Sequence, residues 1–188
     1  MKTRLQGKAV ALLVTDGFEQ VELTEPKAAL EESGATVHIV APKGDQVQGW
    51  NHMEKGDRFN VDVPLAAAKP VDYWALVLPG GVISADHIRM DPDAVEFVRD
   101  FNGKGKLIAA ICHGAWLLIE ADAVDCKRVT SYSSLQTDLR NAGAQWVDEE
   151  VVLDNHLITS RMPADLPAFN AAIIEALAKA APAKDPVT

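Results

Sequence analysis

The sequence Lys106-Leu107-Ile108-Ala109-Ala110-Ile111-Cys112-His113-Gly114-Ala115-Trp116-Leu117-Leu118-Ile119 predicts a strand that turns directly into a helix. No loop residues separate the apolar run before Cys112 from the apolar segment after it. Small residues, Ala110 and Gly114, lie two positions to either side, as in a nucleophile elbow. Such a turn exposes the side chain above the sheet and directs helix N–H groups at it, which favours a thiolate. We therefore predict that Cys112 is a nucleophile.

The alternative interpretation of Cys112 is a structural one. A free cysteine is among the most buried residue types and often packs as a small apolar side chain. The pair Ile111-Cys112 alone favours that interpretation, whereas the pattern of small residue, cysteine and glycine at a strand-to-helix junction favours a functional thiol.

Composition places the chain among ordinary globular proteins. It has 188 residues, of which 48% are hydrophobic and 24% charged, and its formal net charge is −9. This acidic balance argues against a nucleic-acid partner and against an anionic membrane surface. Two cysteines make no disulfide scaffold and fit a reducing compartment. With no signal peptide and no apolar run of membrane-spanning length, we expect a cytoplasmic location.

Apolar runs of strand length alternate along the chain with segments of helical periodicity. Strands are expected at residues 8–15, 36–41, 71–81, 106–111, 128–132, 145–147, 151–153 and 157–160, with short strands within 46–63. Helices are expected at residues 21–33, 91–103, 113–119, 134–142 and 163–181. This alternation predicts an α/β fold with a mainly parallel sheet covered on both faces, as a single domain over residues 1–181, followed by a flexible tail at 182–188.

Three turns are expected at the carboxyl ends of the parallel strands, where ligands bind in such folds. They are Asp16 to Glu19, Gly80-Gly81 and Cys112-His113. A glycine pair lets backbone N–H groups approach a ligand closely, as an oxyanion hole requires, although such a pair is also common in simple turns.

With these pieces in place, the chain resembles the PfpI/ThiJ family of the class I glutamine amidotransferase-like superfamily from about Lys8 to Leu177. The motifs that carry the resemblance are Asp16-Gly17-Phe18-Glu19-x-x-Glu22-Leu23, Ala75-Leu76-Val77-Leu78-Pro79-Gly80-Gly81, Ala109-Ala110-Ile111-Cys112-His113-Gly114, Val129-Thr130-Ser131-Tyr132, Asn141-Ala142-Gly143-Ala144-x-Trp146-Val147-Asp148 and Thr159-Ser160-Arg161-x-Pro163-x-Asp165-Leu166-Pro167-Ala168-Phe169. The resemblance implies a flavodoxin-like sandwich and a homo-oligomer, commonly a dimer or a hexamer.

The resemblance also implies a catalytic set. The family's nucleophile falls on Cys112 and its adjacent histidine on His113, and the acid that hydrogen-bonds the thiol falls on Glu19. The oxyanion hole falls on Gly81 together with the backbone N–H of His113. A further acid, supplied across a subunit interface to orient the histidine, falls on Asp86.

Two departures from the family pattern lie near this set. Ala115-Trp116 stand where proline and a polar residue are usual, so Trp116 is expected to line the pocket together with Gly80. Tyr132-Ser133-Ser134 replaces a common Pro-Gly turn.

The resemblance implies a cysteine-dependent hydrolase, acting on a small carbonyl compound or on a peptide or protein. Peptide hydrolysis, conversion of methylglyoxal to lactate and repair of glyoxal adducts all fit the thiol chemistry. The alternative is a non-enzymatic stress protein, either a holdase chaperone or a redox sensor in which Cys112 is oxidised. The histidines and cysteines lack the spacing of a metal site, and no cofactor is expected.

Overall fold

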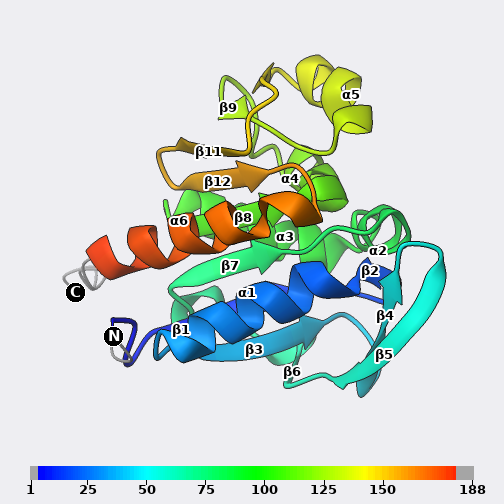
Figure 1. The fold of residues 1–188 in the computed structure, drawn as a ribbon, viewed down its shortest axis with the longest axis vertical. Helices are drawn as coiled ribbons and strands as arrows, with labels where there is room; N and C mark the ends of the chain where they lie inside the picture. The colour runs from blue at the N-terminus through cyan, green and yellow to red at the C-terminus, as the bar shows by residue number, and fades with distance from the viewer. Residues whose placement is uncertain (1–3, 181–188) are drawn as a thin grey trace.

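The computed structural model describes residues 4–180, which form a three-layer α/β fold (Figure 1). A seven-stranded sheet is its middle layer. The strands, in spatial order, are β11 (Val151–Asp154), β12 (Leu157–Ser160), β8 (Leu107–Ile111), β7 (Ala75–Leu78), β1 (Ala9–Leu13), β3 (Thr36–Ala41) and β6 (Val63–Pro64). Neighbouring strands are parallel except for the edge pair β11 and β12. The architecture is flavodoxin-like and confirms the predicted fold class.

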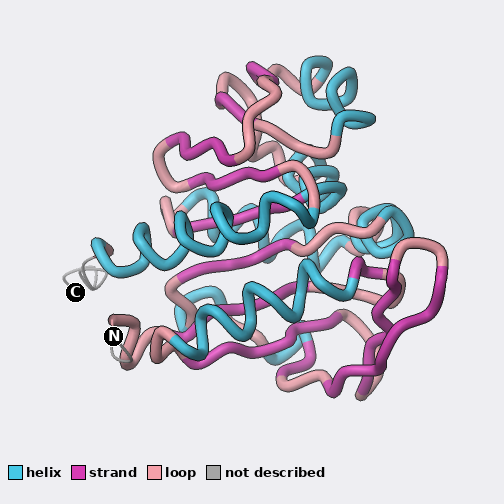
Figure 2. Tube along the Cα trace, viewed as in Figure 1, coloured by secondary structure: helices cyan, strands magenta, loops and turns pink. Residues whose placement is uncertain are grey.

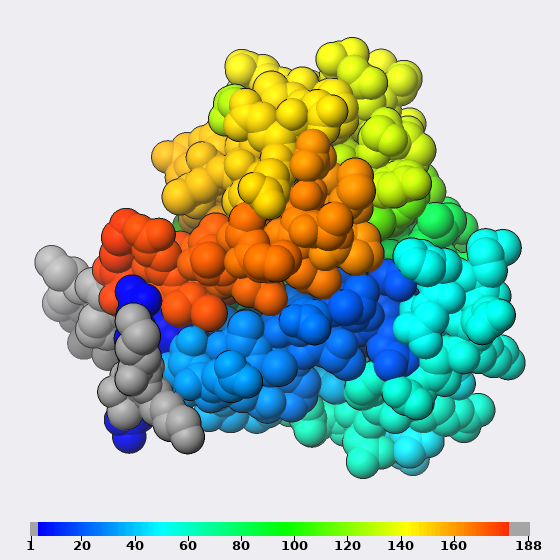
Figure 3. All heavy atoms as spheres, viewed as in Figure 1, coloured from blue at the N-terminus to red at the C-terminus, as the bar shows by residue number. Residues whose placement is uncertain are grey.

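Helices cover both faces of this sheet (Figures 1 and 2). On one face α1 (Gln20–Glu32) and α6 (Leu166–Lys179) lie side by side, as the space-filling view also shows (Figure 3). The other face carries α3 (Pro92–Gly103) and α4 (Ala115–Glu120). The short helices α2 (Val82–Ile88) and α5 (Gln136–Asn141) complete the set.

Strand β1 shows why continuous apolar runs were a reliable signal. Val10 and Leu12 pack in the core beneath α1 and α6, whereas Ala11 and Leu13 pack in the core beneath α3 and α4. Successive side chains of a strand point to opposite faces, so a strand with helices on both sides must be apolar at every position.

The order of the strands reverses next to β1. The chain passes from β1 to β3 and β6 on one side, and then crosses to β7, β8 and β12 on the other. The crevice at the carboxyl ends of β1 and β7 is the place where such folds bind ligands. The turn after β8, which begins at Cys112, lies beside the end of β7.

Two small sheets lie outside the main one. Strands β4 (Gln46–Asn51) and β5 (Glu54–Asn60) form an antiparallel hairpin, and β2 (Phe18–Glu19) pairs parallel with β4. This confirms the short strands expected within residues 46–63. The hairpin lies near α2, past the carboxyl ends of the main strands (Figure 1). Strands β9 (Arg128–Val129) and β10 (Gln145–Trp146) make the second small sheet.

Some boundaries differ from the predicted ones. Residues 70–72 form a 3-10 helix, so β7 begins only at Ala75 rather than at residue 71. Strand β9 ends at Val129, and a 3-10 helix at Ser133–Leu135 precedes α5. Helix α3 begins as expected and is capped by Asp91, whose carboxylate accepts the N–H groups of Asp93 and Ala94 at 3.0 and 3.1 Å. Residues 181–188, which include the predicted tail, lie outside the described residues.

Candidate active site at the Cys112 elbow

The turn between β8 and α4 is a strained elbow. Cys112 has φ of 60°, in the left-handed region that residues with a Cβ adopt at a penalty of about 1–2 kcal/mol. A 3-10 turn, Cys112–Gly114, leads from the strand straight into α4. Gly114 lies so close to β7 that a Cβ there would be 2.4 Å from the carbonyl oxygen of Leu78. The expected strand, strained cysteine and helix are therefore present.

The carboxyl group beside the thiol belongs to Glu22, and the expectation that Glu19 would take this place is wrong. Glu22 lies on α1, is fully buried and hydrogen-bonds the Cys112 side chain. Its Oε2 accepts the N–H of Gly80 at 2.8 Å. Glu19 instead precedes the first residue of α1, and its carboxylate accepts the backbone N–H of His52 at 3.1 Å.

A signal for Glu22 was present in the sequence. Residues spaced by four share one face of a helix, and Glu22 has this spacing with Pro26 and Leu30, both of which are buried. An acid on the apolar face of a helix is unusual and marks a functional candidate.

Burial determines the protonation of this pair. It raises the pKa of Glu22 to about 8, against the opposing effect of the hydrogen bonds from Gly80 and Cys112. Burial and then the nearby Glu22 carboxylate raise the pKa of Cys112. The backbone N–H groups of His113 and Gly81 lower the pKa of this thiol, as the elbow predicts, but they do not outweigh burial. At neutral pH both groups therefore hold their protons, and the free thiolate expected from the sequence is a minor form.

His113 lies beside the thiol and is enclosed by its own chain. Its Nδ1 is 3.2 Å from the Cys112 sulfur, and its Nε2 is 3.3 Å from Oγ of Ser134. The ring stacks on Tyr132 with centroids 4.9 Å apart and meets the Trp116 ring edge-on at 5.2 Å. Burial lowers the pKa of His113, so its imidazole is neutral at pH 7 and able to accept a proton.

Gly80 and Gly81 pack closely against the thiol and its neighbours. Gly81 has φ of 91°, and a Cβ on it would lie 2.5 Å from the Glu19 nitrogen. A Cβ on Gly80 would lie 2.6 Å from Glu22 Oε2 and 2.7 Å from the Cys112 Cβ. Only glycine fits at either position. The N–H groups of Gly81 and His113 both hydrogen-bond the Cys112 sulfur.

Of the other two predicted site residues, Asp86 is exposed to solvent and Trp116 lies against the His113 ring. Asp86 is exposed on α2, and its side chain makes no hydrogen bond or ion pair within residues 4–180. Trp116 borders the imidazole, and its Nε1 donates to Asp138 at 2.9 Å while Arg89 lies 5.3 Å above its ring.

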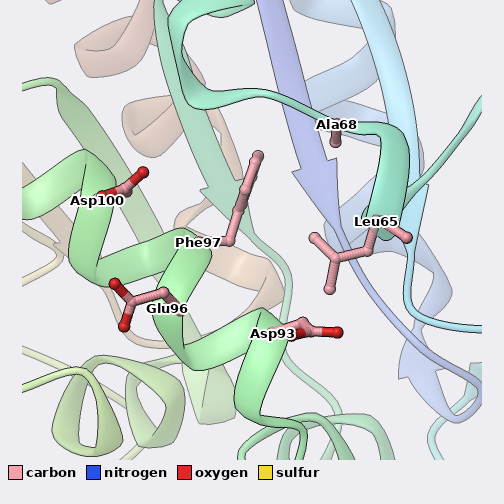
Figure 4. A pocket seen from close by; sticks show the side chains of 7 residues that line it. Leu65, Ala68, Asp93, Glu96, Phe97 and Asp100 are labelled. Atoms are coloured by element: carbon pink, nitrogen blue, oxygen red, sulfur yellow. The ribbon is translucent and has the colours of Figure 1, made fainter.

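Two hollows of the described surface are lined by residues outside the elbow. One, of about 350 Å³, lies between residues 65–68 and α3, where Asp93, Glu96 and Asp100 border it together with Phe97 (Figure 4). The other, of about 460 Å³, is lined by residues that include Thr15, Lys43 and His87. The thiol itself lies in a narrow niche, since Cys112 is only 8% exposed.

A doubly wound sheet with an elbow cysteine at the carboxyl ends of its strands, flanked by a buried acid and a histidine, places the protein among the flavodoxin-like α/β proteins. The chain belongs to the DJ-1/PfpI family, which its sequence matches over residues 8–176. The family resemblance inferred from the motifs is thus confirmed. No helix within residues 4–180 is long and apolar enough to cross a membrane.

Relatives and solved structures agree with this membership. An uncharacterized protein of Staphylococcus epidermidis is 40% identical over 172 residues, which cover 90% of this chain and 98% of that protein. A two-domain protein of Anabaena variabilis, with DJ-1/ThiJ/PfpI-like and ferritin-like domains, superposes with a TM-score of 0.85 at 32% identity. This chain is covered to 96% and spans only 52% of that one. Drosophila melanogaster DJ-1beta superposes with a TM-score of 0.82 at 28% identity, covering 92% of this chain and 91% of its own.

Proposed function

We propose that the protein is a cysteine-dependent enzyme that converts small α-oxoaldehydes such as methylglyoxal to α-hydroxy acids. One observation carries the proposal. A carboxyl group, an imidazole nitrogen and two backbone N–H groups all meet the sulfur of a strained elbow cysteine. These are the nucleophile, the acid–base groups and the oxyanion donors that addition to a carbonyl requires.

The residues divide the chemistry as follows. The Cys112 sulfur forms a bond to the aldehyde carbon while its proton passes to Nδ1 of His113, and the carbonyl electron pair moves to oxygen. The N–H groups of Gly81 and His113 hold that oxyanion. His113 passes the thiol proton to the neighbouring carbonyl oxygen, which frees Nδ1 to take the proton from the former aldehyde carbon and deliver it to the neighbouring carbon. This transfer leaves a hydroxyl on that neighbour and a thioester on Cys112, while the buried Glu22 carboxyl remains protonated beside the sulfur. Water hydrolyses the thioester, the carbon–sulfur bond breaks, and the thiol regains its proton, so that the net reaction adds one water.

The burial of the thiol and of the imidazole favours a small carbonyl compound over a peptide. Cys112 and His113 are only 8% and 7% exposed, and the rings of Tyr132 and Trp116 flank the imidazole. An extended peptide needs a groove that leads to the nucleophile, whereas an α-oxoaldehyde of three carbons does not. Repair of glyoxal adducts on proteins and peptide hydrolysis are the competing activities for the same thiol.

Lactate formation from methylglyoxal tests the proposal. Cys112→Ala removes the nucleophile, so we expect turnover to fall by about a hundredfold or more. Cys126→Ala is the matched control, because Cys126 is the exposed free cysteine and lies away from the elbow, and this variant should keep its activity. Unchanged lactate formation by Cys112→Ala would contradict the proposal. Thiol-dependent cleavage of a fluorogenic peptide, without lactate formation, would assign peptidase activity instead.

A redox sensor is the second candidate. The observation that favours it is the buried Glu22 carboxyl beside the sulfur, whose Oε1 has no hydrogen-bond partner among the described residues. A protonated carboxyl there can donate to an oxygen added to sulfur by peroxide. Mass spectrometry after mild peroxide treatment separates the two functions, since a sensor requires selective oxidation of Cys112 over the exposed Cys126. Suppression of aggregation that survives in Cys112→Ala would indicate a thiol-independent holdase.

We retain a homo-oligomer, either a dimer or a hexamer, as part of the proposal. The family resemblance supports it. The exposed apolar side chains Val82, Ile83 and Met90, which are 53%, 41% and 70% exposed on or just after α2, also support it because they lie close to the elbow turns.

A further inference from the structure

Both ring nitrogens of His113 already have partners from the same chain. Nδ1 faces the Cys112 sulfur at 3.2 Å, and Nε2 faces Oγ of Ser134 at 3.3 Å. Ser134 belongs to the 3-10 helix Ser133–Leu135, which stands where the family usually has a Pro-Gly turn. The chain therefore supplies a hydroxyl of its own to the imidazole, whereas the resemblance implies an acid from a partner subunit.

A hydroxyl and a carboxylate act differently on an imidazole. A carboxylate only accepts, so it requires a proton on Nε2 and stabilises the imidazolium ion. A serine hydroxyl can both donate and accept. An imidazole that accepts the thiol proton on Nδ1 carries its own proton on Nε2, and Ser134 accepts from this Nε2–H both before and after the transfer. In the other neutral tautomer, with the proton on Nδ1, Ser134 can donate to Nε2. The same contact therefore serves His113 before and after the proton transfer.

Neighbouring side chains hold the ring in this orientation. Tyr132 stacks on one face with an interplanar angle of 30°, and Trp116 meets it at 68°. Trp116 is in turn tied to Asp138 and lies beneath Arg89, which pairs with Glu120. The ionisable groups around the imidazole are thus the Cys112 thiol, with Glu22 beyond it, and the phenol of Tyr132. Asp138 and Arg89 act only through the Trp116 ring.

We propose that Ser134 is the positioning residue of His113, whose hydroxyl holds Nε2 so that Nδ1 faces the thiol, and that it does so in place of Asp86 from a second subunit. This inference rests on the proposed function, because it assigns His113 the role of proton acceptor. It makes the histidine's orientation a property of one chain.

This proposal can be tested on the full-length protein by two measurements that do not depend on catalytic turnover. Long-range proton–nitrogen correlation spectra of the ¹⁵N-labelled protein report the protonation of each ring nitrogen of His113. Iodoacetamide alkylation, followed by mass spectrometry on the Cys112 peptide, reports the reactivity of the thiol, with the Cys126 peptide as internal reference. The variants are Ser134→Ala, Ser134→Thr and Asp86→Asn, with Ser133→Ala as the control from the same turn.

Ser134→Ala should shift the Nε2 resonance of His113 and slow Cys112 alkylation by about threefold to tenfold, the range expected for one lost hydrogen bond. Ser134→Thr keeps a hydroxyl and should restore both to within about twofold, which excludes a folding defect as the cause. Ser133→Ala and Asp86→Asn should match the wild type. The proposal is overturned if Ser134→Ala behaves like Ser133→Ala, or if Asp86→Asn alone moves the His113 resonances. A wild type that makes no lactate would refute the proposed function and leave these two readouts intact.

Discussion

At the scale of single residues, Glu19 and Glu22 are only three positions apart in the sequence, yet only Glu22 contacts the Cys112 thiol. Both acids belong to the same motif, and one helical turn separates them. Glu19 directly precedes helix α1, and its carboxylate accepts the N–H of His52. Glu22 lies within the first turn of that helix and contacts Gly80 and Cys112. Burial of Glu22 without a cationic partner then keeps its carboxyl protonated at neutral pH.

Glu22→Gln should make the thiol easier to ionise. The negative charge that Glu22 acquires near pH 8 raises the pKa of Cys112, and an amide of the same shape never acquires that charge. We expect the midpoint of the alkylation profile of Cys112 to fall by about one pH unit or more, the usual effect of removing a nearby like charge.

Glu19→Gln is the matched control for this experiment. Its carboxylate contacts His52 rather than the sulfur, so the profile of Cys112 should stay in place. An equal shift in both variants would show that Glu22 has no special relation to the thiol.

At the scale of elements, the elbow depends on close contact between α4 and β7. Gly114 directly precedes α4 and lies against the end of β7. The carbonyl oxygen of Leu78, the last residue of β7, occupies the space that a side chain at Gly114 would need. A side chain here must push the helix away from the strand, because the contacting atom belongs to the backbone and cannot rotate aside.

Gly114→Ala should therefore destabilise the protein by about 1–3 kcal/mol, as overpacking of a rigid site does. Urea unfolding measures this loss. Gly103→Ala is the control, because a Cβ at Gly103, the last residue of α3, meets no atom within 4 Å. Equal stability of the two variants would mean that the contact between helix and strand is not tight.

At the scale of the whole molecule, the buried acid links folding to pH. The pKa of Glu22 rises from 4.5 to about 8 on folding, so the folded chain holds a proton that the unfolded chain releases between these values. The stability associated with this proton is complete below pH 4.5 and is lost as pH rises through 8. Since each pKa unit corresponds to about 1.4 kcal/mol, the loss is on the order of several kcal/mol.

Comparing the wild type with Glu22→Gln isolates this contribution from those of other groups. The two proteins should have similar free energies of unfolding near pH 4, below the unfolded pKa of 4.5, where the carboxyl is mostly protonated in both the folded and the unfolded chain. The variant should become the more stable one as pH approaches 9. Urea titrations across this range measure the difference, and parallel curves for the two proteins would contradict the assigned burial of the charge.

Much of the fold was predictable from the sequence because the central strands are covered by helices on both faces and must therefore be apolar at every position. Strands β1, β7 and β8 are buried on both faces, so their apolar runs identify them. The cysteine elbow followed from the absence of any loop residues around Cys112 and from the glycine after His113. Helix α2 was not predicted. The short strands β9 and β10 were expected, but not that they pair with each other outside the main sheet, because pairing between distant segments is not encoded in a local pattern.

The sequence by itself determined the parallel sheet, the strained cysteine and the glycines that must lie beside it, since these follow from local periodicity and from the lack of a Cβ. Only the tertiary structure decided which acid meets the thiol, which hydroxyl meets His113, and that burial raises the pKa of Cys112 despite the helix N–H groups. These properties depend on side chains from α1, the Ser133–Leu135 turn and the elbow meeting in space, and on how much water their packing excludes.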